Sequence, residues 1–240
     1  MKPDKIYLHT DCSTGFEESN YWNSIKSLAK DLLKLVKRHP PKTVFGSELN
    51  VIEHKSDIAR LLILLEVGGI YLDDDVVVLK SFDDFLDEQM VLGEENYDAL
   101  ANSVILANKD SWFLQKWFLE YRYFNDAIWS HHSCFVPWGL WKLFPEKIHV
   151  AKENMLRPNW EEIFLIYKNH YNFSDNYAMH LYARFLTQVD KLEGDRSIQE
   201  LMELDSTYGD LARFILVGDK TIRPPGVGLT AEESANLLLN

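Results

Sequence analysis

The sequence has few cysteines and no long apolar run, and both absences narrow the class of protein. Its two cysteines, Cys12 and Cys134, form neither a disulfide framework nor a zinc-ligand pattern. We expect two buried thiols, with one bridge between them as the alternative. No segment reaches the roughly 18 apolar residues that a membrane span needs, and residues 1–10 lack the apolar core of a signal peptide. Taken alone, the chain is typical of a soluble cytoplasmic protein.

Basic side chains are also scarce. Lysine and arginine number 25 against 37 aspartates and glutamates, so the formal net charge is −12. Nucleic-acid binding normally needs a basic patch, and we therefore expect no nucleic-acid partner. A metal-dependent enzyme suits an acidic chain because a bound cation offsets part of the charge, although solubility alone would also explain the balance.

Helical and strand patterns interleave along the 240 residues, which favours an α/β fold with a sizeable core. Apolar spacing predicts helices at residues 21–38, 54–67, 111–124, 137–144, 160–167 and 197–204. Short apolar runs predict strands at residues 5–9, 43–45, 70–72, 76–79, 90–93, 103–107, 148–150, 178–181 and 214–217, with an acidic loop at residues 94–98. The signal weakens near residue 195, so we expect one domain over residues 1–195 and an extension of unclear role over residues 196–240.

The helix predicted at residues 54–67 opens the most informative stretch. Ser56 is its expected N-cap, and Asp57 then lies in the first turn, where the helix dipole favours a carboxylate. Gly68 and Gly69 are expected to end the helix. The expected buried stripe is Ile58, Leu61, Leu62 and Leu65.

Three consecutive carboxylates, Asp73, Asp74 and Asp75, follow the short strand at residues 70–72 and precede a second apolar run. On an extended segment Asp73 and Asp75 would point to one side, where they could share a hard cation such as Mg²⁺ or Mn²⁺. Asp74 would point the other way or toward a ribose. An EF-hand loop would need a glycine and a terminal glutamate that are missing, and a phosphatase nucleophile motif would need a following threonine.

Asp57 and Arg60 are three residues apart and therefore share a helix face. An intrahelical ion pair on the surface would explain them without any ligand. Contacts to the hydroxyl groups and phosphate of a sugar donor are the functional alternative, because arginine suits forked contacts.

Ser56-Asp57-x-x-Arg60, followed by the stretch from Gly68-Gly69 to Asp73-x-Asp75, resembles the glycosyltransferase sugar-binding region that contains a DXD motif. This group includes galactosyl- and N-acetylglucosaminyltransferases, yeast initiating mannosyltransferases and clostridial glucosylating toxins, and the chain is most similar to uncharacterised animal members. The resemblance extends over about residues 4–185 and includes the strand around Asn102 and the aromatic segment around His180.

The resemblance implies a GT-A-like nucleotide-diphospho-sugar transferase fold, with a mixed sheet flanked by helices. It implies retaining transfer of a hexose from a nucleotide sugar, in first place a UDP-sugar, to a carbohydrate or glycolipid hydroxyl. By resemblance, the metal ligands for Mn²⁺ (or Mg²⁺) would be Asp73, Asp75 and His180, with a diphosphate contact as the alternative role of His180 and with His131 and His132 as weaker candidates. The donor sugar would contact Asp57, Arg60 and Asn102, and the diphosphate or nucleotide would contact Tyr71, Asp73 and Asp74. No catalytic base or nucleophile is identified.

Two departures from the family pattern bear on activity. Family members begin with an apolar strand and helix before the segment that matches residues 5–10, so we expect a fold without that first strand. A non-catalytic relative that binds a nucleotide sugar or glycan is therefore the alternative, with a metal-dependent phosphohydrolase more distant. Ser133-Cys134 also replaces a Gly-Pro found in many relatives.

The family points to the Golgi lumen, with the membrane anchor absent from this chain. The glycosylation sequon Asn172-Phe173-Ser174 matters only in that compartment.

Overall fold

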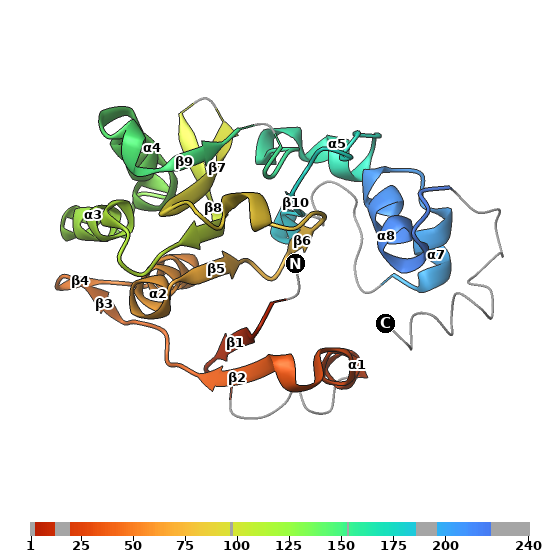
Figure 1. The fold of residues 1–240 in the computed structure, drawn as a ribbon, viewed down its shortest axis with the longest axis horizontal. Helices are drawn as coiled ribbons and strands as arrows, with labels where there is room; N and C mark the ends of the chain where they lie inside the picture. Colours follow the sequence, from red (N-terminus) through yellow and green to blue (C-terminus); the bar gives the residue numbers. More distant parts are fainter. Residues whose placement is uncertain (1–2, 13–19, 97, 153, 186–195, 222–240) are drawn as a thin grey trace. The chain divides into compact units, whose positions relative to one another are not determined.

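Helices and short strands alternate along the chain (Figure 1), and the predicted α/β class is confirmed. The fold is that of a computed structural model, which describes residues 3–12, 20–96, 98–152, 154–185 and 196–221. The helices are α1 (Asn20–Ala29), α2 (Ile52–Val67), α3 (Trp112–Glu120), α4 (Val136–Leu143), α5 (Ile163–Tyr167), α7 (Ile198–Glu203) and α8 (Thr207–Val217). The strands are β1 (Ile6–Thr10), β2 (Leu33–Lys37), β3 (Thr43–Val44), β4 (Ser47–Glu48), β5 (Gly69–Leu72), β6 (Val76–Val78), β7 (Met90–Asn96), β8 (Ala99–Ala107), β9 (His149–Ala151) and β10 (Ala178–His180).

The described strands form small mixed sheets. The largest has the order β5-β8-β7-β9, while β1 pairs with β2 in parallel. β3 and β4 form a short antiparallel pair, and β6 pairs antiparallel with β10. The β6–β10 pair matters most for function, because it joins the strand that follows the acidic triplet to a strand about a hundred residues later in the chain.

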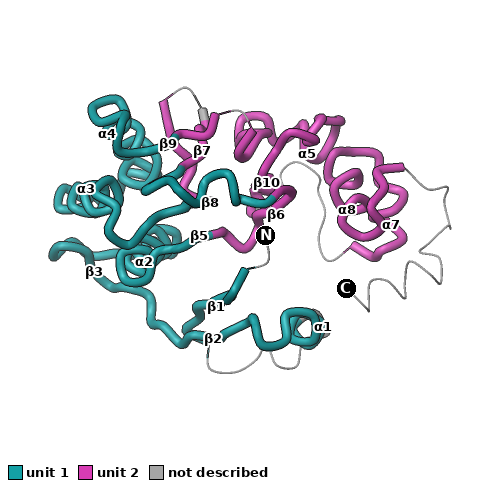
Figure 2. The backbone as a smooth tube through the Cα atoms, viewed as in Figure 1, with its two compact units in different colours: residues 1–71, 81–91, 105–149 teal, residues 72–80, 92–104, 150–240 magenta. Residues whose placement is uncertain are grey.

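The chain divides into two compact units (Figure 2). The first comprises residues 1–71, 81–91 and 105–149, and the second comprises residues 72–80, 92–104 and 150–240. Buried side chains of the first unit include Ile58, Leu61, Leu64, Phe113 and Trp117. The second unit has a buried cluster of Phe173, Met179 and Leu211. The predicted division at residue 195 stays a prediction.

Helix α2 begins earlier than predicted. It starts at Ile52 after Val51, which makes no side-chain cap, so the prediction of Ser56 as N-cap is wrong and Asp57 lies in the second turn. The predicted end is confirmed: Gly68 follows Val67 with φ +67°, and its N–H donates to the Leu64 carbonyl at 2.8 Å. This termination directs the chain into β5.

The buried stripe of α2 also differs from the prediction. Leu62 is 37% exposed and Leu65 is half-buried, whereas Leu64 is buried. Three polar residues share the inward face, namely His54, Asp57 and Arg60. A spacing of three residues places these side chains on one face of the helix. A prediction that counts only apolar residues overlooks them and assigns Leu62 to the buried face instead.

Three further predictions are wrong. The helix predicted at residues 21–38 ends at Ala29, and Leu33–Lys37 forms β2 because a short apolar run fits either period and pairing with β1 decides. The acidic loop at residues 94–98 is largely strand, since β7 extends to Asn96. The strand predicted at residues 214–217 belongs to α8, which begins where Ser206 Oγ accepts from the Gly209 N–H.

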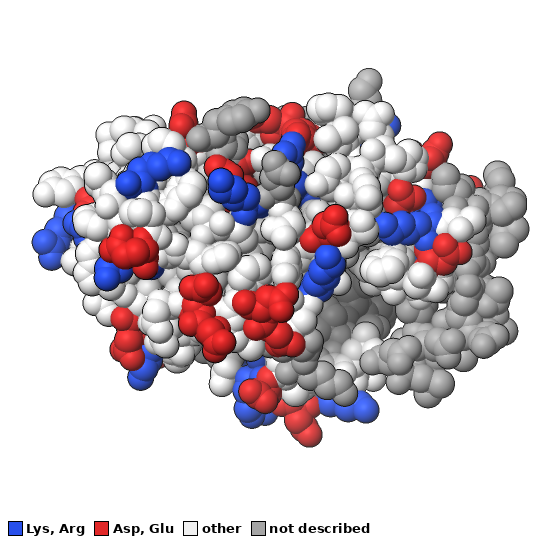
Figure 3. Space-filling model, turned by 45° about the horizontal axis from the view of Figure 1, so that its top comes forward, with Lys and Arg blue, Asp and Glu red and all other residues white. Residues whose placement is uncertain are grey.

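The surface charges and the two cysteines can also be compared with the prediction. Acidic and basic side chains are interspersed on the face that Figure 3 shows, and no continuous basic area is visible there among the described residues. Both cysteines are free thiols; Cys134 is buried as predicted, whereas Cys12 is exposed, so that part of the prediction is wrong.

Candidate functional site

The acidic triplet lies in a turn between β5 and β6. The Asp73 N–H donates to the Ser103 carbonyl on β8 at 2.9 Å, and the Val76 N–H donates to the Asp73 carbonyl at 3.2 Å. The expected extended segment is therefore wrong, because residues 74 and 75 turn. Asp73 and Asp75 are partly buried and Asp74 is exposed, so the turn still separates the first and third carboxylates from the second.

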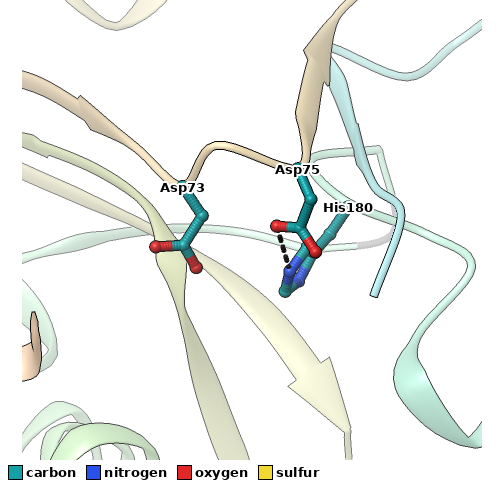
Figure 4. A group of neighbouring side chains, drawn as sticks. All are labelled: Asp73, Asp75 and His180. Carbon is teal, nitrogen blue, oxygen red and sulfur yellow. Dashed lines mark ion pairs between the residues drawn. The ribbon is translucent and has the colours of Figure 1, made fainter. Parts of the chain in front are cut away.

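Strand β10 brings His180 to this turn. In the β6–β10 register His180 is the partner of Val76, the residue directly after Asp75. Figure 4 shows the side chains of Asp73, Asp75 and His180 turned to a common side, with His180 Nε2 3.0 Å from Asp75 Oδ1. One ligand atom from each of these three residues lies within 4.8 Å of the others. All three belong to the second unit.

Asp75 is held in its ionised form. Burial raises its pKa, but the hydrogen bond and charge of His180, together with the Ala183 N–H, outweigh burial and leave the pKa below its ordinary value. The Ala183 N–H donates to Asp75 Oδ2 at 2.8 Å. A carboxylate in this state binds a cation without first losing a proton.

The donor set fits a divalent cation. Two carboxylates supply the oxygen ligands that Mg²⁺ and Mn²⁺ prefer, and an imidazole is an accepted ligand of transition metals. The side chains of His180 and Asp75 are 16% and 21% exposed, which leaves a path for an ion. Among the described residues, Asp73, Asp75 and His180 are the group that could hold a metal ion, and His131 and His132 are not part of it.

Asp57, Arg60 and Tyr71 form a separate arrangement in the first unit. Arg60 Nη2 lies 3.5 Å from Asp57 Oδ1 and donates to Ser56 Oγ at 3.0 Å. The guanidinium lies 4.6 Å from the centre of the Tyr71 ring. Asp57 and Arg60 are 8% and 6% exposed, so the surface ion pair considered from the sequence is excluded. Stacking and pairing fix the guanidinium, which is the arrangement that forked contacts to a ligand require.

Two further residues predicted from the sequence, Asn102 and His132, are partly buried and buried, respectively. Asn102 is partly buried on β8, next to the Ser103 carbonyl that holds Asp73. His132 is buried among the rings of Tyr121 and Phe124 in the first unit. Burial and the neighbouring His131 lower the pKa of His132 to about 4, so its ring is neutral near pH 7. The ligand roles predicted for Asp57, Arg60, Tyr71, Asp73, Asp74, Asp75, Asn102 and His180 stay predictions.

The backbone groups that build the site could not be predicted from the sequence. The Ser103 carbonyl and the Ala183 N–H hold Asp73 and Asp75, and any residue type could supply them. Ser56 was predicted as a cap and instead accepts from Arg60. Its place four residues before an arginine on one helix face is a signal that could have indicated this contact.

Comparisons with known proteins agree with the sequence resemblance. Residues 3–97 match the family described as "Glycosyltransferase sugar-binding region containing DXD motif". The chain is 31% identical over 231 residues to "Glucan organizing enzyme 1" of Cryptococcus neoformans var. grubii serotype A (strain H99), with 89% of the chain and 60% of that relative covered. The chain thus spans about three fifths of the length of this relative. No solved structure matches.

None of the described helices is both long enough and apolar enough to cross a membrane. The matched residues 3–97 include α2, the turn with Asp73 and Asp75, and the whole of β7, but not His180. The family predicted from Asp57, Arg60 and the DXD turn is thereby confirmed, and over residues 3–97 the chain carries the sugar-binding region of the DXD-containing glycosyltransferase family.

Proposed function

We propose that the protein is a metal-dependent glycosyltransferase with a GT-A-like core. It moves a hexose from a nucleotide sugar, in first place a UDP-sugar, to a hydroxyl group of a glycan or glycolipid with retention of configuration. The observation that carries the proposal is the group Asp73, Asp75 and His180, two of whose members lie in the matched sugar-binding region.

The metal site of this proposal consists of Asp73, Asp75 and His180, which would hold Mn²⁺ or Mg²⁺. The imidazole favours Mn²⁺, since Mg²⁺ prefers oxygen ligands. When bound, the ion supplies Lewis-acid stabilisation of the charge on a departing diphosphate. The chain's own contribution is to keep the Asp75 carboxylate ionised and fixed between His180 and the Ala183 N–H.

Asp57, Arg60 and Asn102 would contact the donor sugar. Arg60 already has its guanidinium fixed by Tyr71 and Ser56, so little side-chain entropy is lost when it donates to a ligand. Tyr71 and Asp74 would contact the nucleotide or diphosphate, and Asp74 is exposed at the turn. We assign no base: retention fits a front-face reaction in which an oxygen of the leaving phosphate accepts the proton of the acceptor hydroxyl.

The family also bears on acceptor and location. The name of the Cryptococcus relative, glucan organizing enzyme, supports a glucan-related acceptor for this chain. Family membership supports the Golgi lumen as the place of action. In that compartment the sequon at Asn172 would be available, because Asn172 is exposed.

Release of free UDP tests the proposal. The protein is incubated with Mn²⁺ and a panel of UDP-sugars, with and without glucan and glycolipid acceptors, and UDP is measured. Release that requires Mn²⁺ and vanishes in Asp75→Asn, but persists in Asp87→Asn, supports the enzyme. Asp87 is exposed and lies in the first unit, which makes it a matched control. Binding of UDP-sugar without release would support the non-catalytic alternative, and neither binding nor release would overturn the proposal.

A further inference from the structure

Two of the three residues after His180 donate backbone hydrogen bonds to Asp75. The Leu181 N–H donates to the Asp75 main-chain carbonyl at 2.9 Å, and the Ala183 N–H donates to Asp75 Oδ2 at 2.8 Å. Tyr182 lies between these two hydrogen bonds. The site therefore holds not only His180 but also the turn that follows it.

Tyr182 has a backbone conformation that a tyrosine rarely adopts. Its φ is +51°, in the left-handed region where glycine is the usual residue. Non-glycine residues persist there when the surrounding structure holds them, and they cluster at functional sites. Because a glycine would make the same turn without strain, the presence of a tyrosine points to a use of its ring.

The ring of Tyr182 lies against the His180 imidazole. Their centroids are 4.0 Å apart with an interplanar angle of 34°. The Tyr182 ring is itself fixed, because its side chain is buried against Ile166 and Tyr167 and its hydroxyl lies 3.4 Å from Glu95 Oε1. The Tyr167 hydroxyl donates to the Leu181 carbonyl at 2.6 Å, which immobilises the same turn. The imidazole thus lies against a buried ring that is itself hydrogen-bonded through its hydroxyl.

We propose that Tyr182 is a positioning residue, whose ring holds the His180 imidazole so that Nε2 faces Asp75 and Asp73. This inference rests on the proposed function, since it assigns His180 to the metal site. Neighbours that fix the orientation of a ligating histidine commonly change metal affinity by about 10- to 100-fold when they are removed. The turn at residues 181–183 would then serve the metal site through packing rather than through a ligand atom.

Mn²⁺ affinity tests this assignment without any sugar. Calorimetric titration compares the unchanged protein with Tyr182→Phe, which keeps the ring, and with Tyr182→Gly, which relieves the backbone and removes the ring. We expect Tyr182→Phe to bind within about twofold of the unchanged protein and Tyr182→Gly to bind at least about tenfold more weakly. Tyr182→Leu is measured alongside, because it keeps bulk without aromaticity and decides the matter if the glycine variant does not fold.

A spectroscopic signature separates positioning from general loss of structure. In pulsed electron paramagnetic resonance of the bound Mn²⁺, nitrogen coupling from an imidazole should appear in the unchanged protein and in Tyr182→Phe. It should be reduced in Tyr182→Gly and Tyr182→Leu and absent in His180→Ala. Unfolding in EDTA checks that each variant is folded.

The two proposals fail in different ways. If His180→Ala binds Mn²⁺ as tightly as the unchanged protein, or if the unchanged protein shows no nitrogen coupling, the proposed metal site is wrong. If His180→Ala weakens binding while folded Tyr182→Gly and Tyr182→Leu bind and couple normally, the metal site stands and the assignment of Tyr182 is overturned.

Discussion

Two of the three consecutive aspartates differ from the third in their surroundings. Asp73 and Asp75 are partly buried beside His180, and Asp74 is exposed at the same turn. The Asp73 N–H is bound to the Ser103 carbonyl, while Asp75 accepts from His180 and from the Ala183 N–H. Three chemically identical side chains can therefore serve two purposes, because backbone contacts and the turn decide which of them faces the imidazole.

Substituting each aspartate by asparagine separates these purposes. We expect Asp73→Asn and Asp75→Asn to weaken Mn²⁺ binding at least about tenfold, because each change removes one anionic oxygen donor. Asp74→Asn should leave Mn²⁺ affinity within about twofold and weaken only the binding of a nucleotide sugar. Calorimetry with Mn²⁺ alone, then with UDP-sugar added, measures both. Equal loss of Mn²⁺ affinity in all three variants would show that the turn binds the ion without distinguishing its carboxylates.

His132 gives stability a pH dependence of its own. Burial and then His131 lower its pKa to about 4, against an ordinary value of 6.5. Between about pH 6.5 and about pH 4 the His132 imidazole is protonated in the unfolded chain but not in the folded chain. The free energy of unfolding therefore falls as the pH falls through this range. In His132→Gln this part of the acid loss should disappear. Free energies of urea unfolding at about pH 7.5 and about pH 5 test this, and an unchanged pH difference in the variant would contradict it.

Among the elements, those with a local signal were predictable and those decided by distant partners were not. Ser111 predicts the start of α3 because serine is a favoured N-cap residue, and in the structure its Oγ accepts from the Leu114 N–H. Gly68 likewise predicts the end of α2. Leu33–Lys37, by contrast, continues a helical pattern and becomes a strand only because β1 lies alongside it. Phe214 to Val217 is a β-favouring run within α8, where the helix set by Ser206 prevails over propensity.

The candidate site was predictable from the sequence only as a set of residues. The DXD turn and the resemblance together gave Asp73, Asp75 and His180, and the pairing of β6 with β10 brings them together. The reason offered for Asp73 and Asp75, an extended segment, was wrong because residues 74 and 75 turn. The contacts that hold the site, from Ser103 and Ala183, are made by backbone groups and carry no sequence signature.

Gly68 links α2 to β5 through a conformation and a close approach that both require glycine. Its φ is +67°, and a Cβ would lie 2.9 Å from the Lys109 backbone nitrogen and 3.1 Å from the Ala107 carbonyl oxygen. We expect Gly68→Ala to destabilise the protein by about 2–4 kcal/mol, from the positive φ and from displaced backbone. Gly218→Ala is the matched control, because Gly218 has φ +73° and open space, and it should cost about 1 kcal/mol. Urea unfolding measures both, and equal costs would mean that the close approach is relieved without penalty.

His170 links the segment after α5 to α8. Its pKa is shifted in the opposite direction to that of His132, so its effect on stability depends on pH in the opposite sense. Its Nδ1 lies 2.7 Å from Asp210 Oδ2 and its Nε2 lies 2.7 Å from Asp205 Oδ1. The hydrogen bond to Asp210, and then that to Asp205, raise the pKa of His170. Its contribution to stability is therefore complete below about pH 6.5 and is lost as the pH rises through the raised folded-state value.

The variant His170→Asn should accordingly lose more stability in mild acid than in mild base. Urea unfolding of the two proteins at about pH 5.5 and about pH 8.5 gives the comparison. The effect should be modest because the imidazole is 52% exposed and solvent screens the ion pairs. An equal loss at both pH values would assign the contribution of His170 to packing instead of charge.

For the whole molecule, the division into units places the candidate ligands together. Asp73, Asp75 and His180 all belong to the second unit, while Asp57, Arg60 and Tyr71 belong to the first. Each set has its internal contacts within its own unit. These three candidate ligands come from two segments far apart in the chain, residues 72–80 and residues 150–240. An ion bound there would cross-link those segments, so metal binding and the stability of that unit are linked.

Hydrogen exchange with and without Mn²⁺ tests this linkage. At about a hundred times its dissociation constant, an ion that binds only the folded site adds about 2.7 kcal/mol to openings that break the site, which slows exchange through them about a hundredfold. We expect slowing at the amides of Asp73, Val76 and Leu181, whose hydrogen bonds build the site. The β1–β2 pair in the first unit should exchange as before. Asp75→Asn should abolish the slowing, and uniform slowing in both units, or slowing that persists in Asp75→Asn, would place the ion elsewhere.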